Sequence, residues 1–392
     1  MSATGAPAVT GDDVAAARPA VDEVARRTPV LPSATLTDLL GAEVHLKAEN
    51  LQRTGSFKVR GAVSKVSALG DRCANGVVAA SAGNHAMALA HAARALGVRC
   101  EVFMPAQAPL TKVEGARALG AEVVLGGASV DECLTQAIER SRASDMAFVH
   151  PFDDPDVVAG QGTLGLELLE DVPDLAKVVV PVGGGGLASG VAIAVKSARP
   201  EVEVVGVEVD RASLTIADGI AVKHPGELTT ALMDRWLDDR VVVSEEEIAH
   251  AMVLLMEKAK LVVEGAGAVG VAALIADRTG VAKAGTTVAV LSGGNVDAGL
   301  LADVARRNET EVGRRLVLLT RLPDRPGSLA RLLTLVGEAG ANLIEVQHVR
   351  EGVELHVRET AVELVLETRG RDHAAEVLKC IEGAGYGTTI LR

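Results

Sequence analysis

Aromatic side chains are scarce in this chain of 392 residues, which has one Trp, one Tyr and four Phe. A hydrophobic core cannot rest on so few rings, although hydrophobic residues make up 48% of the sequence. The core must therefore be built from Val, Leu, Ile and Ala. The length is enough for two or three domains.

Cysteine is also rare. Cys73, Cys100, Cys133 and Cys380 are scattered with no C-x-x-C pair, which argues against a disulfide framework or a zinc site and for reduced thiols. The sequence has neither a basic-then-apolar signal nor an apolar run long enough to cross a bilayer. We therefore expect a soluble, cytoplasmic protein that has no membrane partner.

Positive charge is in deficit. The 39 Lys and Arg residues face 52 Asp and Glu residues, so the formal net charge is −13. Such a chain repels nucleic acids and anionic membranes. We therefore expect no nucleic acid among its partners.

Among the features that are present, the run Gly183-Gly184-Gly185-Gly186 is the most informative. It follows the apolar stretch 176–182 and precedes a helix expected at 187–196. Glycines give up side-chain packing and cost backbone entropy, but their bare N–H groups and the positive end of a helix can together hold an anion. We predict a phosphate-binding loop, and the alternative is a flexible turn.

Two nucleotide motifs can be rejected. No Gly-Lys-Ser/Thr follows the four glycines, as a P-loop requires. Gly265-Ala266-Gly267-Ala268-Val269-Gly270 matches the dinucleotide fingerprint, but residues 245–260 before it have helical spacing. In addition, no acidic residue stands about 20 positions beyond it to bind a ribose.

A second segment, residues 49–62, contains Ser56-Phe57-Lys58. We expect Ser56 to cap a helix that runs to Leu69, which puts Lys58 in its first turn. The helix dipole disfavours a cation there and so favours the neutral amine that a Schiff-base lysine needs. For this position alone, a solvated surface lysine is the alternative.

Two further loops follow short apolar strands. They are Ser81-Ala82-Gly83-Asn84-His85 and Ser292-Gly293-Gly294-Asn295. The Ser81 hydroxyl and the N–H groups after it suit a carboxylate, and the Asn84 amide suits a phenolic oxygen. Either loop alone also fits an ordinary strand-to-helix turn, but four such segments in one chain are harder to explain in that way.

In their order and spacing, the four segments resemble the pyridoxal-phosphate enzymes of the tryptophan-synthase-β-like fold (fold type II). More narrowly, they are similar to the threonine ammonia-lyases, or threonine dehydratases. The resemblance covers nearly the whole chain from Arg27 onward and does not depend on a single loop. It implies pyridoxal 5′-phosphate as the cofactor and an amino acid as the substrate.

The resemblance also implies a role for each residue. Lys58 would bind the cofactor aldehyde and act as the catalytic base on the substrate α-carbon, while Asn84 would bond the ring 3-oxygen and Ser292 the ring nitrogen. The residues implied to hold the cofactor are Phe57, Lys58, Asn84, Gly183, Gly184, Gly185, Gly186, Leu187 and Ser292. Those implied to hold the substrate are Ser81, Ala82, Gly83, Asn84 and His85.

The implied reaction is the β-elimination of L-threonine to 2-oxobutyrate and ammonia, with L-serine as a weaker substrate. A hydroxyl at Ser292, rather than a carboxylate, leaves the ring nitrogen largely unprotonated and disfavours a long-lived carbanion. Serine racemase relatives have a serine where Ala82 stands, so we expect poor racemisation. Alternatives are an L-serine or 3-hydroxyaspartate dehydratase, a β-replacement synthase, and a non-catalytic amino-acid-binding regulatory protein.

Two features depart from the family pattern. Met87 stands where threonine dehydratases usually have glutamine, and residues 209–215 form a shorter segment than relatives have. Some relatives build a cation site that starts at the position of Glu208. Because that site cannot be traced through the short segment, we predict no metal.

Apolar strand-like runs alternate with Ala-rich helices along the first half of the chain, at 76–80 and 86–96, 99–104 and 111–119, and 122–125 and 130–143. Such repeats predict an α/β fold with mostly parallel sheets covered on both faces. By resemblance, residues 1–303 form a catalytic part of two three-layer parallel-sheet domains with a cleft between them. The smaller domain, at about 51–148, is inserted in the larger.

The character of the chain changes after residue 303. Residues 304–314 are charged and have the composition of a linker, and residues 315–392 read strand, helix, strand, strand, helix, strand. This βαββαβ order resembles a ferredoxin-like ACT domain. It implies an amino-acid effector, isoleucine first and valine second, bound near Asp324, Gly327, Ser328 and Leu329. The alternative is a module that only joins subunits, and the resemblance implies a homotetramer or homodimer.

Overall fold

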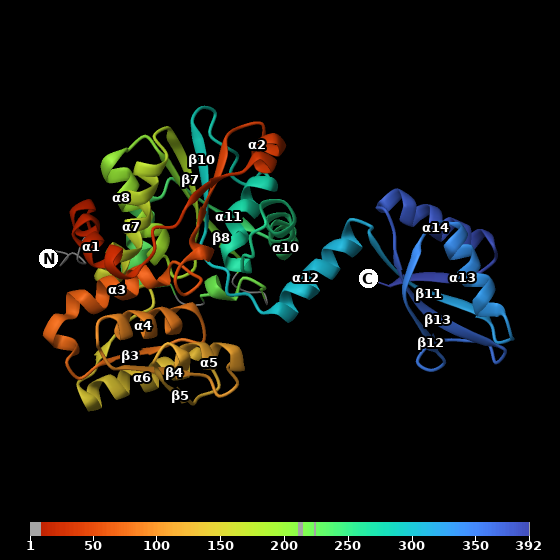
Figure 1. Ribbon diagram of the computed structural model, residues 1–392, viewed down its shortest axis with the longest axis horizontal. Coiled ribbons are helices and arrows are strands. Elements are labelled where there is room, and N and C mark those ends of the chain that lie inside the picture. Colours follow the sequence, from red (N-terminus) through yellow and green to blue (C-terminus); the bar gives the residue numbers. More distant parts are fainter. Residues whose placement is uncertain (1–8, 211–214, 223–224, 392) are drawn as a thin grey trace, which may run out of the picture. The chain divides into compact units, whose positions relative to one another are not determined.

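The computed structural model describes residues 9–210, 215–222 and 225–391, so most of the short segment 209–215 lies outside the described part. The chain forms two compact units, Met1–Val296 and Asp297–Arg392 (Figure 1). The first unit contains two mostly parallel sheets, and the second contains one antiparallel sheet. The predicted α/β class is confirmed.

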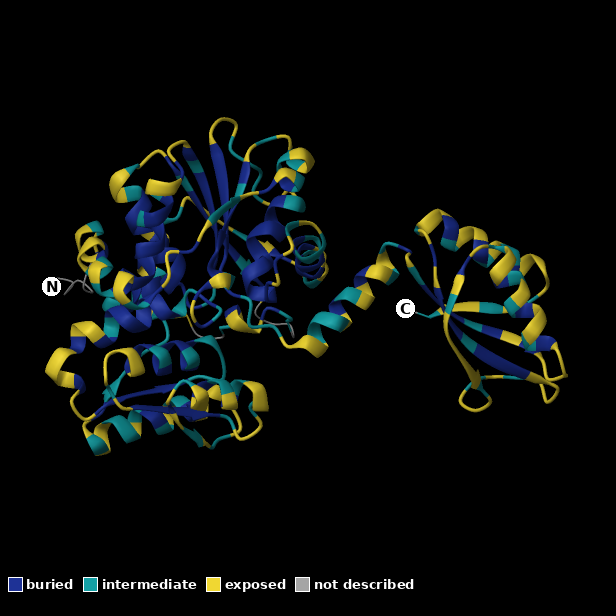
Figure 2. Ribbon diagram, in the orientation of Figure 1, coloured by how far each residue is buried: buried dark blue, intermediate teal, exposed yellow. Residues whose placement is uncertain are grey.

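The larger sheet of the first unit consists of β1 (Val30–Pro32), β2 (Val44–Ala48), β7 (Leu175–Pro181), β8 (Glu203–Val209), β9 (Asp239–Val243) and β10 (Thr286–Leu291). Its strand order is β1-β2-β10-β7-β8-β9, and only β1 runs antiparallel to its neighbour. Every residue of β10 is buried. Such fully buried strands are typical of a parallel sheet covered on both faces, and Figure 2 shows the buried centre in dark blue.

Helices lie on both sides of this sheet (Figure 1). α7 (Pro155–Asp171) and α8 (Gly186–Ala198) form one apolar cluster with the sheet, while α11 (Gly265–Ile275) contacts β7 to β10 from the other side. The unit also contains α1 (Gly11–Val24), α2 (Ala34–Leu40), α9 (Glu227–Trp236), α10 (Glu245–Leu254), η3 (Asp218–Ile220) and a π-helical turn η4 (Leu255–Ala259).

Helices α7 and α8 approach each other at backbone distance. A Cβ atom on Gly162 would lie 2.8 Å from the carbonyl oxygen of Gly190, and one on Gly190 would collide with the carbonyl oxygen of Val158. Only glycine permits this contact. The two helices therefore pack without intervening side chains at this point.

The smaller sheet consists of β3 (Val77–Ala80), β4 (Cys100–Met104), β5 (Glu122–Leu125) and β6 (Ala147–Phe148), all parallel, in the order β5-β4-β3-β6. α3 (Lys58–Leu69), α4 (Asn84–Ala95) and α5 (Leu110–Ala118) share one apolar cluster with it, and α6 (Val130–Ser144) belongs to a second cluster. Short 3₁₀ turns η1 (Glu49–Leu51) and η2 (Gly70–Cys73) flank α3. These bounds agree closely with the predicted strands and helices.

The predicted helix cap at Ser56 is wrong. Helix α3 begins at Lys58, its cap position is Phe57, and no side chain caps it. Ser56 instead pairs with Gly293 in an isolated antiparallel bridge, and the Phe57 N–H donates to the carbonyl oxygen of Ser292 at 3.0 Å. Two loops that are far apart in the sequence are thereby joined next to Lys58.

A fully buried cluster of charges fixes helix α3. The Arg60 guanidinium donates to the Glu49 carboxylate at 2.8 and 2.9 Å and to the Glu167 carboxylate at 2.7 and 3.0 Å. Lys47 also donates to Glu167, and all four side chains are at most 2% exposed. Burial opposes the charge on Glu49, but the attraction of Arg60 lowers its pKa. The cluster joins β2, η1, α3 and α7.

The second unit has the predicted βαββαβ order: β11 (Arg315–Pro323), α13 (Ser328–Glu338), β12 (Asn342–Val349), β13 (Glu359–Glu367), α14 (Arg371–Gly383) and β14 (Thr388–Leu391). Its antiparallel sheet has the order β12-β13-β11-β14. Leu332 and Val336 of α13 and Val377 and Ile381 of α14 are buried in one cluster with the sheet.

The charged segment 304–314 is not an irregular linker over most of its length. It continues helix α12 (Ala298–Glu311). Its charges support the helix, because Arg306 pairs with Asp303 and Arg307 pairs with Glu311 at helical spacing.

Arg60→Met is expected to destabilise the first unit by about 3–5 kcal/mol, because Glu49 would remain buried without its cation and Glu167 would keep only Lys47. Urea unfolding followed by the fluorescence of Trp236, the single Trp of the chain, measures this change. Arg99→Met serves as the control. It removes an exposed pair with Glu122 and should leave the unfolding midpoint unchanged. An Arg60→Met protein as stable as the parent would contradict the role of the cluster.

Candidate active site

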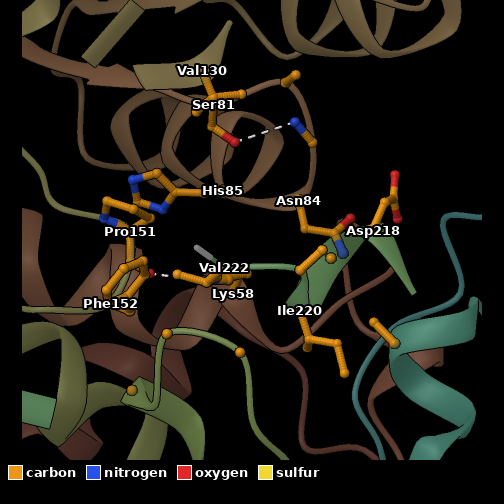
Figure 3. Close-up of a pocket in the computed structure, with 18 of the residues that line it drawn as sticks. Lys58, Ser81, Asn84, His85, Val130, Pro151, Phe152, Asp218, Ile220 and Val222 are labelled. Carbon is orange, nitrogen blue, oxygen red and sulfur yellow. Dashed lines mark hydrogen bonds between the residues drawn. The ribbon is translucent and has the colours of Figure 1, made fainter. Parts of the chain in front are cut away.

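A cavity of about 660 Å³ opens in the first unit, where residues of both sheets meet (Figure 3). It is lined by segments that directly follow three strands: Ser81 follows β3, Gly183 closely follows β7 and Ser292 follows β10. In α/β proteins, ligands bind outside the carboxyl ends of parallel strands. The cavity is therefore the candidate active site.

The structure brings together every residue of the first unit that the sequence marked as a candidate. The residues that line the cavity include Phe57, Lys58, Ser81, Ala82, Gly83, Asn84, His85, Gly183, Gly184, Gly185, Gly186, Leu187 and Ser292. The four candidate effector residues belong to the second unit.

Lys58 is the first residue of α3, and its side chain points into the cavity (Figure 3). Its Nζ donates a 2.8 Å hydrogen bond to the carbonyl oxygen of Pro151. His150 shapes that segment, because its Nδ1 accepts from the N–H of Asp153 at 2.8 Å. Burial lowers the pKa of the Lys58 amine to about 8, against the opposing attraction of Glu264. The neutral form is therefore a minority near physiological pH, but a far larger fraction than for a solvated lysine.

The tetraglycine run forms a tight loop between β7 and α8. The backbone N–H groups of Gly183 to Leu187 donate to no acceptor within the described residues. Gly185 has a φ of +87°, a Cβ atom on Gly184 would collide with the Phe152 ring, and one on Gly183 would lie 2.8 Å from the Cα of Ile220. Glycine is thus required for packing here, and it leaves a row of amides free beside the cavity.

The loop from Ser81 to His85 forms another part of the cavity wall. The Ser81 hydroxyl accepts a 3.2 Å hydrogen bond from the Gly83 N–H (Figure 3). His85 Nε2 donates to the carbonyl oxygen of Val149 at 3.1 Å. Burial, and secondarily the charge of Lys58, lowers the pKa of His85 to about 3. His85 is therefore a neutral imidazole and no proton donor near pH 7.

Ser292 is buried, and within the described residues its hydroxyl makes only a long 3.4 Å contact with the carbonyl oxygen of Ala266. At that length the hydrogen bond is weak. The hydroxyl is thus available to a ligand atom in the cavity.

Glu264 is a cavity residue that the sequence reasoning missed. It directly precedes helix α11 and is 6% exposed. Its Oε1 accepts a 2.7 Å hydrogen bond from Asn84 Nδ2. Burial, reinforced by the charge of Asp218, raises the pKa of Glu264 to about 7. No local pattern marks this residue, because its partner stands 180 positions earlier in the chain; it adjoins the rejected 265–270 motif.

The candidate effector residues surround the start of α13. Gly327 caps this helix with a φ of +82°, and Asp324 forms an ion pair with Arg350 at 2.8 Å. The Ser328 N–H donates to the Arg325 carbonyl oxygen at 3.2 Å, so it is engaged in the turn. The N–H groups of Gly327 and Leu329 have no backbone acceptor in the described chain.

The residues of the cavity fit pyridoxal 5′-phosphate. A row of free amides suits its phosphate, an amine with a lowered pKa suits its aldehyde, and Asn84 and Ser292 offer polar side chains for the ring. Among residues 9–210, 215–222 and 225–391, no group of three or more His, Cys, Asp or Glu side chains could hold a metal ion. In the same residues, no helix combines the length and apolar character needed to span a membrane.

Comparison with known families agrees with this assignment. Residues 21–293 match the pyridoxal-phosphate dependent enzymes, and residues 316–383 match the ACT domain. The chain belongs to the family of pyridoxal-phosphate dependent enzymes and has a C-terminal ACT domain. The suspected family and its cofactor are thus confirmed.

Individual relatives are similar over most of the chain. The L-threonine ammonia-lyase of Thermotoga maritima is 44% identical over 98% of this chain and 100% of its own. The structure of the processed form of threonine deaminase isoform 2 from Solanum lycopersicum is 36% identical, covers 75% of this chain and 86% of its own, and has a TM-score of 0.71. The structure of maize serine racemase is 32% identical, covers 78% of this chain and 99% of its own, and has a TM-score of 0.72.

In the cofactor-free protein, Lys58 is expected to be acetylated by limiting acetic anhydride at a rate that rises as the pH passes about 8, because only the neutral amine is nucleophilic. Peptide mass spectrometry measures the label, with the exposed Lys379 as internal reference. Prior addition of pyridoxal phosphate should protect Lys58 and leave Lys379 reactive. A Lys58 rate with no rise near that pH would contradict the depressed pKa.

Proposed function

We propose that the chain catalyses the β-elimination of L-threonine to 2-oxobutyrate and ammonia, and that L-serine is a weaker substrate. The observation that carries this proposal is one cavity that combines the Lys58 amine, the free amides of Gly183 to Leu187, and Asn84. Similarity to the Thermotoga maritima L-threonine ammonia-lyase over 98% of the chain supports the choice of threonine.

Lys58 is the base in this proposal. Pyridoxal phosphate, when bound, supplies the electron sink that makes the α-proton of an amino acid acidic. Because burial lowers the pKa of Lys58 to about 8, the neutral amine is available to take that proton near neutral pH. The carbonyl oxygen of Pro151 is a neutral acceptor at 2.8 Å and holds the side chain in the cavity.

The other site residues bind and orient. The amides of Gly183 to Leu187 would hold the phosphate, the Asn84 amide would bond the ring 3-oxygen, and the Ser292 hydroxyl would bond the ring nitrogen. The Ser81 hydroxyl and the N–H groups that follow it would receive the substrate carboxylate. A hydroxyl at Ser292 donates weakly, which favours prompt loss of the β-hydroxyl over a persistent carbanion.

The residues of the Ser81–His85 loop disfavour racemisation. Ala82 has no titratable group, and His85 is neutral and bonded to the carbonyl oxygen of Val149. Neither can return a proton to the α-carbon near pH 7. We therefore favour elimination over racemisation, although maize serine racemase has a similar fold.

We also propose that an amino acid, isoleucine before valine, binds near Asp324, Gly327, Ser328 and Leu329 and changes the activity. Residues 1–303 would carry out catalysis, residues 304–314 would connect the two parts, and residues 315–392 would regulate the activity. We expect the protein to be a cytoplasmic homotetramer or homodimer. The family match of residues 316–383 to an ACT domain supports the regulatory assignment.

The purified protein should absorb visible light, form 2-oxobutyrate from L-threonine faster than pyruvate from L-serine, and form no D-serine from L-serine. Lys58→Ala should lose the absorbance and lower turnover more than about 1,000-fold, because it removes both the attachment and the base. Absorbance and product assays on the same samples measure this. Faster turnover of serine would instead favour the L-serine dehydratase, and a colourless, inactive parent would favour a non-catalytic regulatory protein.

Isoleucine is expected to change the threonine affinity or the turnover rate by about 5- to 150-fold, the usual range of coupling between two sites. Steady-state kinetics on L-threonine with and without millimolar isoleucine or valine measure the effect. If neither amino acid changes the rate or the affinity, the second unit has no such effector and only joins subunits.

A further inference from the structure

Asn84 is held by two side chains that sequence reasoning left without a role. Its Nδ2 donates to Glu264 Oε1 at 2.7 Å, and its Oδ1 accepts from Asn295 Nδ2 at 2.7 Å. The Asn295 Nδ2 also donates to the carbonyl oxygen of Thr54 at 2.8 Å. The four groups form one continuous chain of hydrogen bonds beside the cavity.

Donor and acceptor chemistry leaves a single direction for this chain. The Thr54 carbonyl oxygen can only accept, so Asn295 must turn its NH₂ group toward it. The same NH₂ group faces Asn84, which must therefore present its oxygen to Asn295 and its own NH₂ to Glu264. One hydrogen of the Asn84 NH₂ group is then left for a ligand.

Close packing holds both partners in place. A Cβ atom on Gly293 would collide with Glu264 Oε1, and one on Gly55 would collide with Asn295 Oδ1. Gly55 and Gly293 belong to the two loops that meet at the bridge beside Lys58, and the Gly294 N–H donates to the Gly55 carbonyl oxygen at 2.9 Å. Neither partner can rotate freely, so the Asn84 amide is preset.

We propose that Glu264 and Asn295 are positioning residues that lock the Asn84 amide with its NH₂ group toward the 3-oxygen of bound pyridoxal phosphate. This inference rests on the proposed function, in which Asn84 bonds that oxygen. A flipped amide would turn its own oxygen toward the cofactor oxygen and repel it. The two residues thus act through Asn84.

The charge on Glu264 adds a pH dependence to this lock. Burial first, then Asp218 of η3, raises the pKa of Glu264 to about 7, while Lys112 of α5 and Lys58 of α3 oppose the rise. Below that pH the carboxyl group is neutral and accepts weakly from Asn84. Above it the carboxylate is a stronger acceptor, so the bonded state of Asn84 changes across neutral pH.

The test titrates cofactor-free protein with pyridoxal phosphate and records the visible spectrum from about pH 6 to about pH 9, a window that brackets the Glu264 pKa. Glu264→Leu removes the acceptor, Asn295→Asp removes the donor, and Glu264→Gln keeps an acceptor but cannot ionise. Glu139→Leu, at an exposed position of α6, is the matched control. Trp236 fluorescence during urea unfolding checks that each variant is folded.

Glu264→Leu and Asn295→Asp should each raise the dissociation constant of pyridoxal phosphate about tenfold, the size of one buried hydrogen bond. Glu139→Leu should bind as the parent does at every pH, and Glu264→Gln should do so below about pH 7, where Glu264 of the parent is also neutral. A spectral step near neutral pH should occur in the parent and vanish in Glu264→Gln, a change that a merely structural role would not produce. If Glu264→Leu does not fold, the affinity of Asn295→Asp for pyridoxal phosphate and the spectra of Glu264→Gln still test the inference.

Parental affinity in both Glu264→Leu and Asn295→Asp would overturn the inference, and so would a Glu264→Gln variant as weak as Glu264→Leu. Binding and turnover are measured separately. A parent that binds pyridoxal phosphate but makes no 2-oxobutyrate would defeat the proposed function and leave this inference standing on its binding data.

Discussion

The active site depends on the buried charges around Arg60. A guanidinium and an ammonium group face two carboxylates in a place that water does not reach, and each ion is costly there unless all its partners are present. Arg60 stands two residues after Lys58, so the same turn of α3 that carries the cluster also aims the amine at the cavity. Glu49 and Glu167, which hold Arg60, therefore also fix the orientation of Lys58.

Burial acts on the titratable groups of the cavity in one direction, toward the neutral form. It lowers the pKa of Lys58 to about 8 and that of His85 to about 3, and it raises that of Glu264 to about 7. A single physical cause thus makes a base of the lysine, removes the histidine as an acid, and leaves the glutamate balanced between two states.

The alternation of apolar runs and Ala-rich helices was enough to predict the parallel sheets, since period and length carry that signal directly. Three of the four cavity segments were also predictable from position, because residues 81–85, 183–187 and 292 stand just after strands in glycine- or serine-rich loops. The backbone bridge of Ser56 and the place of Glu264 in the cavity could not be predicted. Ser56 is a residue type that often caps helices, but its backbone pairs with Gly293 in a tertiary bridge. The hydrogen bond between Glu264 and Asn84 joins residues that only the fold brings together.

The backbone contact between Gly162 of α7 and Gly190 of α8 has a mechanical consequence. Two helices that touch in this way cannot slide past each other without steric overlap. Helix α7 carries Glu167, which accepts hydrogen bonds from Arg60, and α8 begins at the tetraglycine loop. The lysine and the anion loop are therefore parts of one stiff body. A change in the packing of α7 against α8 would therefore alter the spacing of the two cofactor anchors.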